Sequence, residues 1–473
     1  MSSLVPLIQH SSSSRLGALN RLRLIGSHLS PSSPTTSTTS LPRSRLNTRQ
    51  FSNSSSVKQR RDQFTFTTAC SFRGKPGSPI YTLPTSSSSS SSSTSTDDTT
   101  KDGGKFKLKQ GLNSSHPLSK WRDEQLEKSP NGAGHDWFFV QGIPTNGDSQ
   151  LLEQEGAKPG DDNEEKIKII GIKGVVLGVA DGVGGWEESG VDPSHFSQAL
   201  MWFSKEIIKN GQFELKKGGK GLKELLDQAF EMVLKEKEIL AGSSTACLVA
   251  LDSETGKLHA ANLGDSSFMI LRPQSQQLAT PPPSPNPSPS SDTSNSSSPE
   301  TTAPTYTVIH SEPSQTHFFN APYQLSKLPP SSRAGAADNS LMDSASDAAT
   351  TPKGGIQLRE GDVVVLSTDG FGDNVFNEEM EQLCKLVHEK CLEQQGGSVD
   401  GGGEDSSRVV DPHLLASSLS QTSLNFARLV MFKKDKVTPF EVEARKYGYG
   451  RNSGLGGGKV DDVTVVVAVV GKN

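Results

Sequence analysis

A pair of amphipathic helices stands between groups of short apolar strands, and this order limits the chain to few folds. Asp192-Pro193 is a helix start, because Asp caps helices well and Pro fits the first helical position. Apolar residues then recur with helical spacing over 196–207 and 222–233, and the turn at 253–256 joins two strands as a hairpin. The strand patterns lie at 167–180, 246–251, 258–262, 268–271, 362–367 and 463–470. This order predicts an α+β fold with antiparallel sheets.

Serine- and proline-rich segments divide the chain. Apolar side chains make up 32% of the 473 residues, and adding the 45 glycines gives about 41%, below the ~45–50% of ordinary globular chains. We expect a disordered serine-rich linker at 61–130 and one folded domain at 131–473. Three similar stretches, near 274–304, 331–354 and 394–408, are expected to be disordered insertions in its surface loops, where added length costs little.

The first 60 residues have the composition of a targeting segment. Nine Arg and Lys residues precede the first acidic residue, Asp62, and the segment is rich in serine. Leucines alternate with arginines over 15–24, which favours a short basic amphipathic helix, and there is no continuous apolar stretch of the secretory kind. We interpret 1–60 as a mitochondrial transit peptide with a cleavage site near Arg49–Ser52; a disordered basic tail is the alternative.

Charge, hydropathy and cysteine content exclude several classes of protein. A formal net charge of −5 argues against a generally basic nucleic-acid binder. No run of 18 apolar residues is present, so no membrane-spanning helix is expected. The cysteines form neither a disulfide framework nor a CxxC pair. They are Cys70, Cys247, Cys384 and Cys391.

Aspartates stand where apolar strand patterns stop, in four motifs. They are Asp181, Asp265, Asp369 and Asp461. An aspartate beside buried valines loses hydration, and this is unfavourable unless its charge is compensated. Taken alone, each Asp-Gly pair is typical of a turn. The repetition of the pattern favours a shared site.

Converging carboxylates repel one another unless cations lie between them. Positive residues near these motifs look too few to neutralise them. Oxygen ligands without His or Cys favour hard cations such as Mg²⁺ or Mn²⁺. Two such ions about 3.5–4 Å apart are a standard arrangement for hydrolysing phosphate esters. The motifs therefore indicate a metal site.

These motifs, in this order, resemble the metal-dependent type 2C protein serine/threonine phosphatase family over about 136–470. Other segments resemble one branch, the mitochondrial phosphatases close to the T-cell-activation type 2C phosphatase. They are Gly178–Trp186, Gly190–Ser194, Gly242–Ala246, Ala261–Ser266 and Pro322–Leu325. The resemblance implies a four-layer α-β-β-α sandwich, with two antiparallel sheets flanked by helix pairs. It also implies that 131–473 is a phosphatase catalytic domain.

The resemblance further implies two Mn²⁺ or Mg²⁺ ions per active site. Asp181 would bridge both ions, and Gly182 would offer its carbonyl oxygen to the second. Asp369 and Asp461 would complete the first ion's ligands, so that with Asp181 they carry the catalysis. Asp136 falls where the family places an acidic pair near the second ion.

Some family positions differ here or are used only by some members. Asp265 and Asp373 match the ligands of a weaker third ion found in some members. The first residue of the acidic pair is His135 in this chain. Many members carry His directly after the Asp-Gly pair as a general acid, whereas this chain has Val183, which cannot donate a proton. His317 is our candidate for another proton donor.

The expected activity is hydrolysis of phosphoserine or phosphothreonine in proteins of the mitochondrial matrix, by a monomer. Its partners would be phosphoprotein substrates, and no nucleic acid is expected. Two alternatives remain open from the sequence. One is a catalytically weak relative that binds phosphoproteins, and the other is a hydrolase of small phosphate esters.

Overall fold

The computed structural model describes residues 63–76, 113–127, 132–145, 172–274, 303–329, 342–396 and 409–473. All of these residues fall within the unit Arg60–Asn473. The predicted transit peptide lies outside the described residues.

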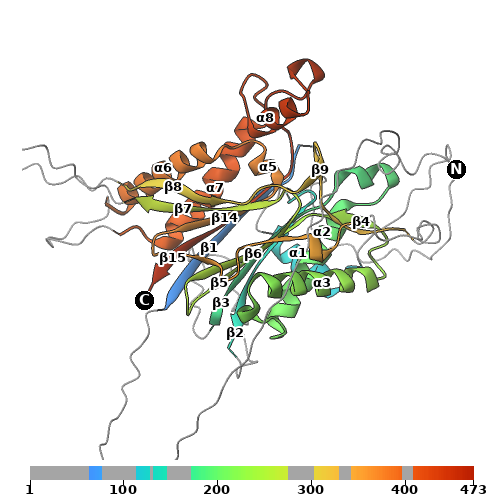
Figure 1. Ribbon diagram of the computed structural model, residues 1–473, viewed down its shortest axis with the longest axis horizontal. Helices are drawn as coiled ribbons and strands as arrows, with labels where there is room; N and C mark the ends of the chain where they lie inside the picture. The colour runs from blue at the N-terminus through green and yellow to red at the C-terminus, as the bar shows by residue number, and fades with distance from the viewer. Residues whose placement is uncertain are drawn as a thin grey trace, which may run out of the picture. The chain divides into compact units, whose positions relative to one another are not determined.

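Two antiparallel sheets form the middle of the domain (Figure 1). In the first sheet the strands follow the order β1 (Phe64–Arg73), β15 (Val463–Lys472), β14 (Val363–Ser367), β7 (Ser267–Gln274) and β8 (Thr305–Ser311). In the second the order is β12 (Ala349–Thr350), β6 (Lys257–Leu263), β5 (Ala246–Asp252), β3 (Ile172–Asp181) and β2 (Asp136–Pro144), and β13 (Ile356–Gln357) also pairs with β6. Neighbouring strands in both sheets pair antiparallel.

Side chains that alternate along the strands of the first sheet contribute to two hydrophobic cores. In β14, Val364 and Leu366 join the core that contains the second sheet, whereas Val363 and Val365 join a core with helices α6 and α7. Successive side chains of a strand point to opposite faces, so the first sheet is covered by the second sheet on one side and by helices on the other. Because both faces of β14 are buried, its sequence is an unbroken apolar run up to Leu366.

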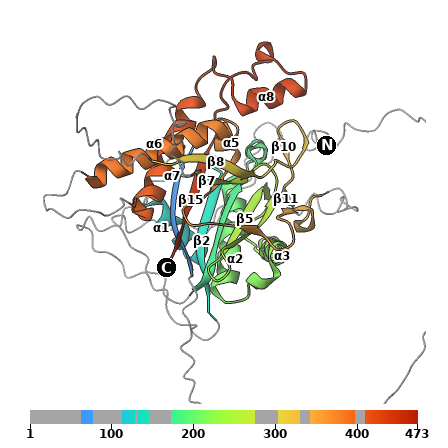
Figure 2. The same ribbon diagram turned by 60° about the vertical axis from the view of Figure 1, so that its left-hand side comes forward.

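A helix pair covers the outer face of each sheet, as the views in Figures 1 and 2 show. Helices α2 (Pro193–Lys209) and α3 (Gly219–Lys235) pack on the second sheet, and α6 (Asn377–Gly396) and α7 (Pro412–Val430) pack on the first. The remaining α-helices and strands of the described residues are α1 (Pro117–Leu126), α5 (Asp369–Gly372), α8 (Pro439–Lys446), β4 (Gly242–Ser244), β9 (Thr316–Phe318), β10 (Ala321–Pro322) and β11 (Leu325–Lys327). The predicted α-β-β-α sandwich is confirmed.

The start of α2 is the one that the sequence predicts. The Asp192 side chain accepts a hydrogen bond from the Ser194 amide at 2.9 Å, and Pro193 occupies the first turn. None of the helices in the described ranges is long and apolar enough to cross a bilayer. All four cysteines are free.

Two predicted boundaries are wrong. The proposed linker 61–130 contains β1, which pairs with β15 along ten residues, and also contains α1. The proposed insertion 331–354 contains β12, in which Ala349 pairs with Asn262. The strand in 64–73 is a short alternating pattern set between serine-rich stretches, so the composition of its surroundings hid it.

A chain that begins at residue 78 should fail to fold, whereas a chain that begins at residue 61 should fold. Strand β1 buries Phe66 and Phe72 and covers the edge of β15. Burying each Phe stabilises the fold by roughly 1.5–3 kcal/mol, and a bare apolar edge promotes aggregation. Thermal melting and solubility of both chains test this expectation, and equal melting temperatures would contradict it.

Candidate active site

Carboxylates from both sheets meet where the strands end. Asp136 begins β2 and Asp181 ends β3, and the two lie directly opposite in the strand register. Asp369 follows β14 after Thr368, whose hydroxyl donates to Asp136 Oδ2 at 2.7 Å. Asp461 lies two residues before β15, the strand that pairs with β14. The Thr368–Asp136 bond therefore ties the two sheets together at the carboxylates.

The backbone of Asp181 is fixed by the segment that contains β4. The Asp181 carbonyl accepts from the Thr245 amide at 3.0 Å and from Ser244 Oγ at 2.8 Å. The Asp181 amide donates to Thr245 Oγ1 at 3.1 Å. Hydroxyl side chains at 244 and 245 therefore have a definite role, which is to hold the aspartate at the end of its strand.

Gly182 occupies a position that admits no side chain. Its amide donates to the His135 carbonyl at 3.1 Å. A Cβ atom at this position would lie 2.6 Å from the Pro193 carbonyl oxygen, which is too close for any real contact. Glycine therefore lets the chain turn tightly against the start of α2 directly after Asp181.

Asp373 and Asp265 also face this cluster. The Asp373 amide donates to the Asp369 carbonyl at 2.7 Å, which places the two aspartates one helical turn apart around α5. Asp265 lies in the turn between β6 and β7, and its charge acts on Asp369 and Asp181. The structure thus gathers all six aspartates that the sequence singled out, with Gly182 beside them.

Lys459 is the member of the cluster that the sequence analysis missed. Its ammonium donates to Asp369 Oδ2, lies 2.8 Å from Asp373 Oδ2 and lies 3.2 Å from Asp461 Oδ2. Lys75 lies on another side, with its Nζ 3.5 Å from Asp461 Oδ1. These two lysines supply positive charge that the sequence did not reveal, but among the described residues they are still too few to balance six carboxylates. In the sequence, Lys459 lies two residues before Asp461, and this position indicates that its charge could reach the cluster.

The carboxylates remain crowded despite these lysines. Burial, and then the neighbouring carboxylates, raise the pKa of Asp181 and Asp136 well above the ordinary value. Burial raises the pKa of Asp369 to about 6, although Lys459 opposes the shift. Burial alone would raise the pKa of Asp461, but Lys459 and Lys75 outweigh it and the pKa is lowered. The cluster holds more negative charge than its own cations balance.

The donor set fits a hard cation. Among the described residues, Asp136 Oδ1, Asp265 Oδ1 and Asp369 Oδ1 are buried without a hydrogen-bond partner. Buried carboxylate oxygens normally have a partner, so these atoms are suited to an additional cation. In the described ranges no three Asp, Glu, His or Cys side chains are arranged to hold a metal ion as they stand. The Lys459 ammonium already lies among three of the carboxylates.

The adjacent aspartates Asp461 and Asp462 have different surroundings. Asp462 is 2% exposed and accepts from the Lys75 amide at 2.6 Å and the His135 amide at 2.9 Å. A Cβ at Gly134 would overlap the Asp462 carboxylate, so the loop closes tightly over it. Asp461 is 18% exposed and faces the lysines. Asp462 therefore binds backbone amides, and Asp461 faces the cluster.

The two histidines of interest contact other groups. His135 Nε2 lies 2.9 Å from Glu187 Oε1, while its carbonyl accepts from Gly182. The His317 ring lies 3.0 Å from Asp343 Oδ2, stacks on Tyr323 and is half-exposed. The described contacts of His317 thus lie outside the carboxylate cluster, and they give it no proton-donor role.

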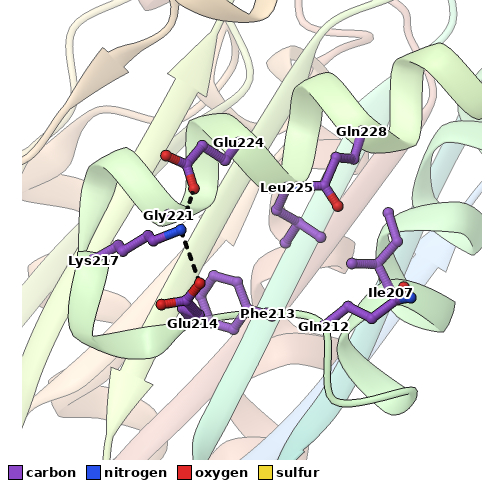
Figure 3. A pocket seen from close by; sticks show the side chains of 9 residues that line it. All are labelled: Ile207, Gln212, Phe213, Glu214, Lys217, Gly221, Glu224, Leu225 and Gln228. Atoms are coloured by element: carbon purple, nitrogen blue, oxygen red, sulfur yellow. Dashed lines mark hydrogen bonds and ion pairs between the residues drawn. The ribbon is translucent and has the colours of Figure 1, made fainter.

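A surface pocket between α2 and α3 has a different character (Figure 3). Lys217 bridges Glu214 and Glu224 there, with both distances 2.9 Å. None of the clustered aspartates lines this pocket. Its charged side chains are paired with each other, so the carboxylate cluster is the better candidate for chemistry.

Comparison with known proteins agrees with the motifs. No family model matches the chain. The chain is 31% identical over 299 residues to the protein phosphatase PTC7 homologue of Xenopus laevis, covering 62% of this chain and 76% of that protein. It is 30% identical over 298 residues to the PTC7 homologue of Homo sapiens, covering 62% and 75%.

Solved structures with similar folds are less similar in sequence. The photosystem II phosphatase PBCP is 23% identical, with a TM-score of 0.43, over 74% of this chain and 94% of that one. The PstP catalytic domain in complex with two manganese ions is 15% identical, with a TM-score of 0.32, over 71% and 98%. On the sequence identity and coverage of the PTC7 homologues, the chain belongs to the type 2C protein serine/threonine phosphatases.

Proposed function

We propose that this phosphatase removes phosphate from phosphoserine and phosphothreonine at a two-metal centre that uses Mn²⁺ or Mg²⁺. The residues that would hold the ions are Asp181, Gly182, Asp369, Asp461 and Asp136. Two such ions, when bound, supply an activated water and positive charge for the phosphoryl oxygens. The proposal rests mainly on the buried oxygens of Asp136 and Asp369 that have no hydrogen-bond partner in the described part of the chain.

The position of Asp181 supports its assignment as the shared ligand. Its carboxylate is influenced by the charges of Asp369, Asp136, Asp461 and Asp265, which come from both sheets. A carboxylate at the centre of such a group reaches both sides of it. The backbone bonds to the β4 segment keep Asp181 in place, so little reorganisation is needed when ions and substrate bind.

The deciding experiment compares substrates and metals. Full-length protein should release phosphate from phosphoserine and phosphothreonine peptides with Mn²⁺ and lose this activity in EDTA. Sugar phosphates and nucleotides should be much poorer substrates. Peptide binding without turnover would indicate the binding-module alternative. Faster turnover of the small metabolites would indicate the small-ester hydrolase.

Val183→His should favour substrates with poor leaving groups. The Val183 amide donates to the Ser243 carbonyl at 3.0 Å, so the backbone is fixed and only the side chain changes. A serine alkoxide needs a proton more than a phenolate does, and a placed acid is worth roughly 10²–10⁴-fold. The ratio of kcat/KM for an aryl phosphate to that for a phosphoserine peptide should therefore fall. Val183→Phe controls for size, and an equal fall in both variants would contradict the missing-acid interpretation.

The chain is further proposed to act on phosphoproteins in the mitochondrial matrix, as a monomer. The support is the run of basic residues in 1–61 without an acid. Import should remove roughly the first 50 residues, with the cut near Gln50 or Phe51, and this cut would leave β1 intact. N-terminal sequencing of protein from purified mitochondria tests this, and an intact Met1 would reject it. Size-exclusion chromatography with light scattering tests the monomer.

A further inference from the structure

Lys459 is held at a fixed point of the carboxylate cluster. Its amide donates to Asn374 Oδ1 at 3.1 Å, and its carbonyl accepts from Asn374 Nδ2 at 2.9 Å. Asn374 Nδ2 also donates to the Gly370 carbonyl at 2.8 Å. The backbone of Lys459 is therefore bonded to the loop that carries Asp369 and Asp373.

The Lys459 side chain is also enclosed. It is 15% exposed, and its ammonium lies 5.7 Å from the centre of the Phe440 ring. The Phe440 amide donates to the Asp373 carbonyl at 3.0 Å, which keeps the start of α8 beside the ammonium. A long, flexible side chain is thus confined, and its charge is directed at the α5 carboxylates.

The ammonium and the expected metal centre can share Asp369. Oδ2 of Asp369 accepts from Lys459, whereas Oδ1 is buried without a partner among the described residues. The other carboxylates beside Lys459 are Asp373, at 2.8 Å, Asp461, at 3.2 Å, and Asp265, whose charge acts on the ammonium. Asp369, Asp373 and Asp265 include both aspartates that the family resemblance assigned to a weaker third ion.

We propose that Lys459 is a built-in cation at the third-ion position, so that this phosphatase binds two divalent ions and not three. This inference rests on the proposed two-metal centre. An ammonium at 2.8 Å from Asp373 and in contact with Asp369 already pairs with the carboxylates that a third ion would need. A divalent ion could enter only by displacing it, at the cost of those charge-assisted bonds.

The test counts Mn²⁺ ions bound per chain and measures melting in EDTA for Lys459→Met and for a matched control, Lys75→Met. Both variants remove one positive charge, but Lys75 contacts Asp461 and Asp462, at 3.5 and 3.7 Å, and is not paired with Asp369 or Asp373. Electron paramagnetic resonance of free Mn²⁺ gives the stoichiometry. Wild type and Lys75→Met should bind two ions, and Lys459→Met should bind three.

Melting in EDTA gives a readout that is independent of activity. Lys459→Met leaves the buried carboxylates uncompensated, so its melting temperature should fall by roughly 5–10 °C. Saturating Mn²⁺ should remove most of that difference. In the double variant Lys459→Met/Asp373→Asn, the loss of one carboxylate should restore stability in EDTA and return the count to two ions.

The outcomes separate this inference from the proposed function. Three ions in wild type, or two in a folded Lys459→Met protein, would overturn the lysine's role and leave the metal centre standing. Fewer than two ions in wild type would contradict the two-metal centre itself. If Lys459→Met does not fold, recovery by Asp373→Asn supports the inference. Failure of that recovery shows that the lysine acts only through packing, and this too overturns the inference.

Discussion

Asp181→Asn should lower Mn²⁺-dependent turnover of a phosphoserine peptide by more than about 100-fold. Changes to residues that only support metal ligands cost about 10–100-fold, and a shared ligand should cost at least as much. The fold should survive, because the bonds from Thr245 and Ser244 to residue 181 involve its backbone. The asparagine also relieves repulsion with the neighbouring aspartates, whose charges act on this carboxylate.

Asp227→Asn is the matched control, since Asp227 is exposed on α3 and the substitution changes the net charge equally. Its turnover should equal that of wild type. Mn²⁺ titration of both variants shows whether the lost activity follows lost metal affinity. Near-normal turnover by Asp181→Asn would contradict the assignment of the cluster as the active site.

Local patterns were enough to predict most of the strands that carry the candidate site, although β2, which carries Asp136, was not among them. Asp181 and Asp369 stand where apolar runs end, Asp461 stands just before one begins, and strand ends on one side of a sandwich are neighbours in space. Asp136 and Asp181 are opposite in the register of β2 and β3, and Thr368 joins them to the other sheet. The sequence therefore predicted the gathering of aspartates, although it did not predict which strands pair.

The edge strand and the second helix pair were harder to predict. Strand β1 pairs with β15, nearly 400 positions later in the chain. The residues next to β1 in the sequence therefore do not indicate which strand it pairs with. Helix α7 does begin with Asp411-Pro412, the same start signal that marks α2, and its Asp411 side chain accepts from the His413 amide at 2.8 Å.

Long-range polar contacts could not be predicted from spacing. Lys459 reaches Asp369 and Asp373 only because Asn374 fixes the loop before β15 against α5. Such contacts depend on the tertiary fold, and a lysine in a glycine-rich loop normally remains in solvent. The choice between Asp461 and Asp462 depended on the family resemblance, and their surroundings give it a physical basis.

Asp462→Ala should destabilise the folded domain strongly, whereas Asp461→Ala should mainly abolish turnover. Removing the Asp462 carboxylate leaves the amides of Lys75 and His135 without their acceptor. Each lost partner of this kind costs about 1–3 kcal/mol, so the free energy of unfolding should fall by about 2–5 kcal/mol. Asp461 accepts from one amide, that of Asp462 at 3.0 Å, and its removal also relieves repulsion with Asp369, so its loss should cost only about 1 kcal/mol.

Urea denaturation in EDTA separates the two effects, because bound metal cannot then mask a change in the protein itself. Phosphopeptide turnover at saturating Mn²⁺ is measured on the fraction that remains folded. The adjacent positions serve as controls for each other, since each substitution removes one carboxylate from the same loop. A stable Asp462→Ala protein without turnover, together with an active Asp461→Ala protein, would show that the ligand is Asp462 and that the amide-binding interpretation of its contacts is wrong.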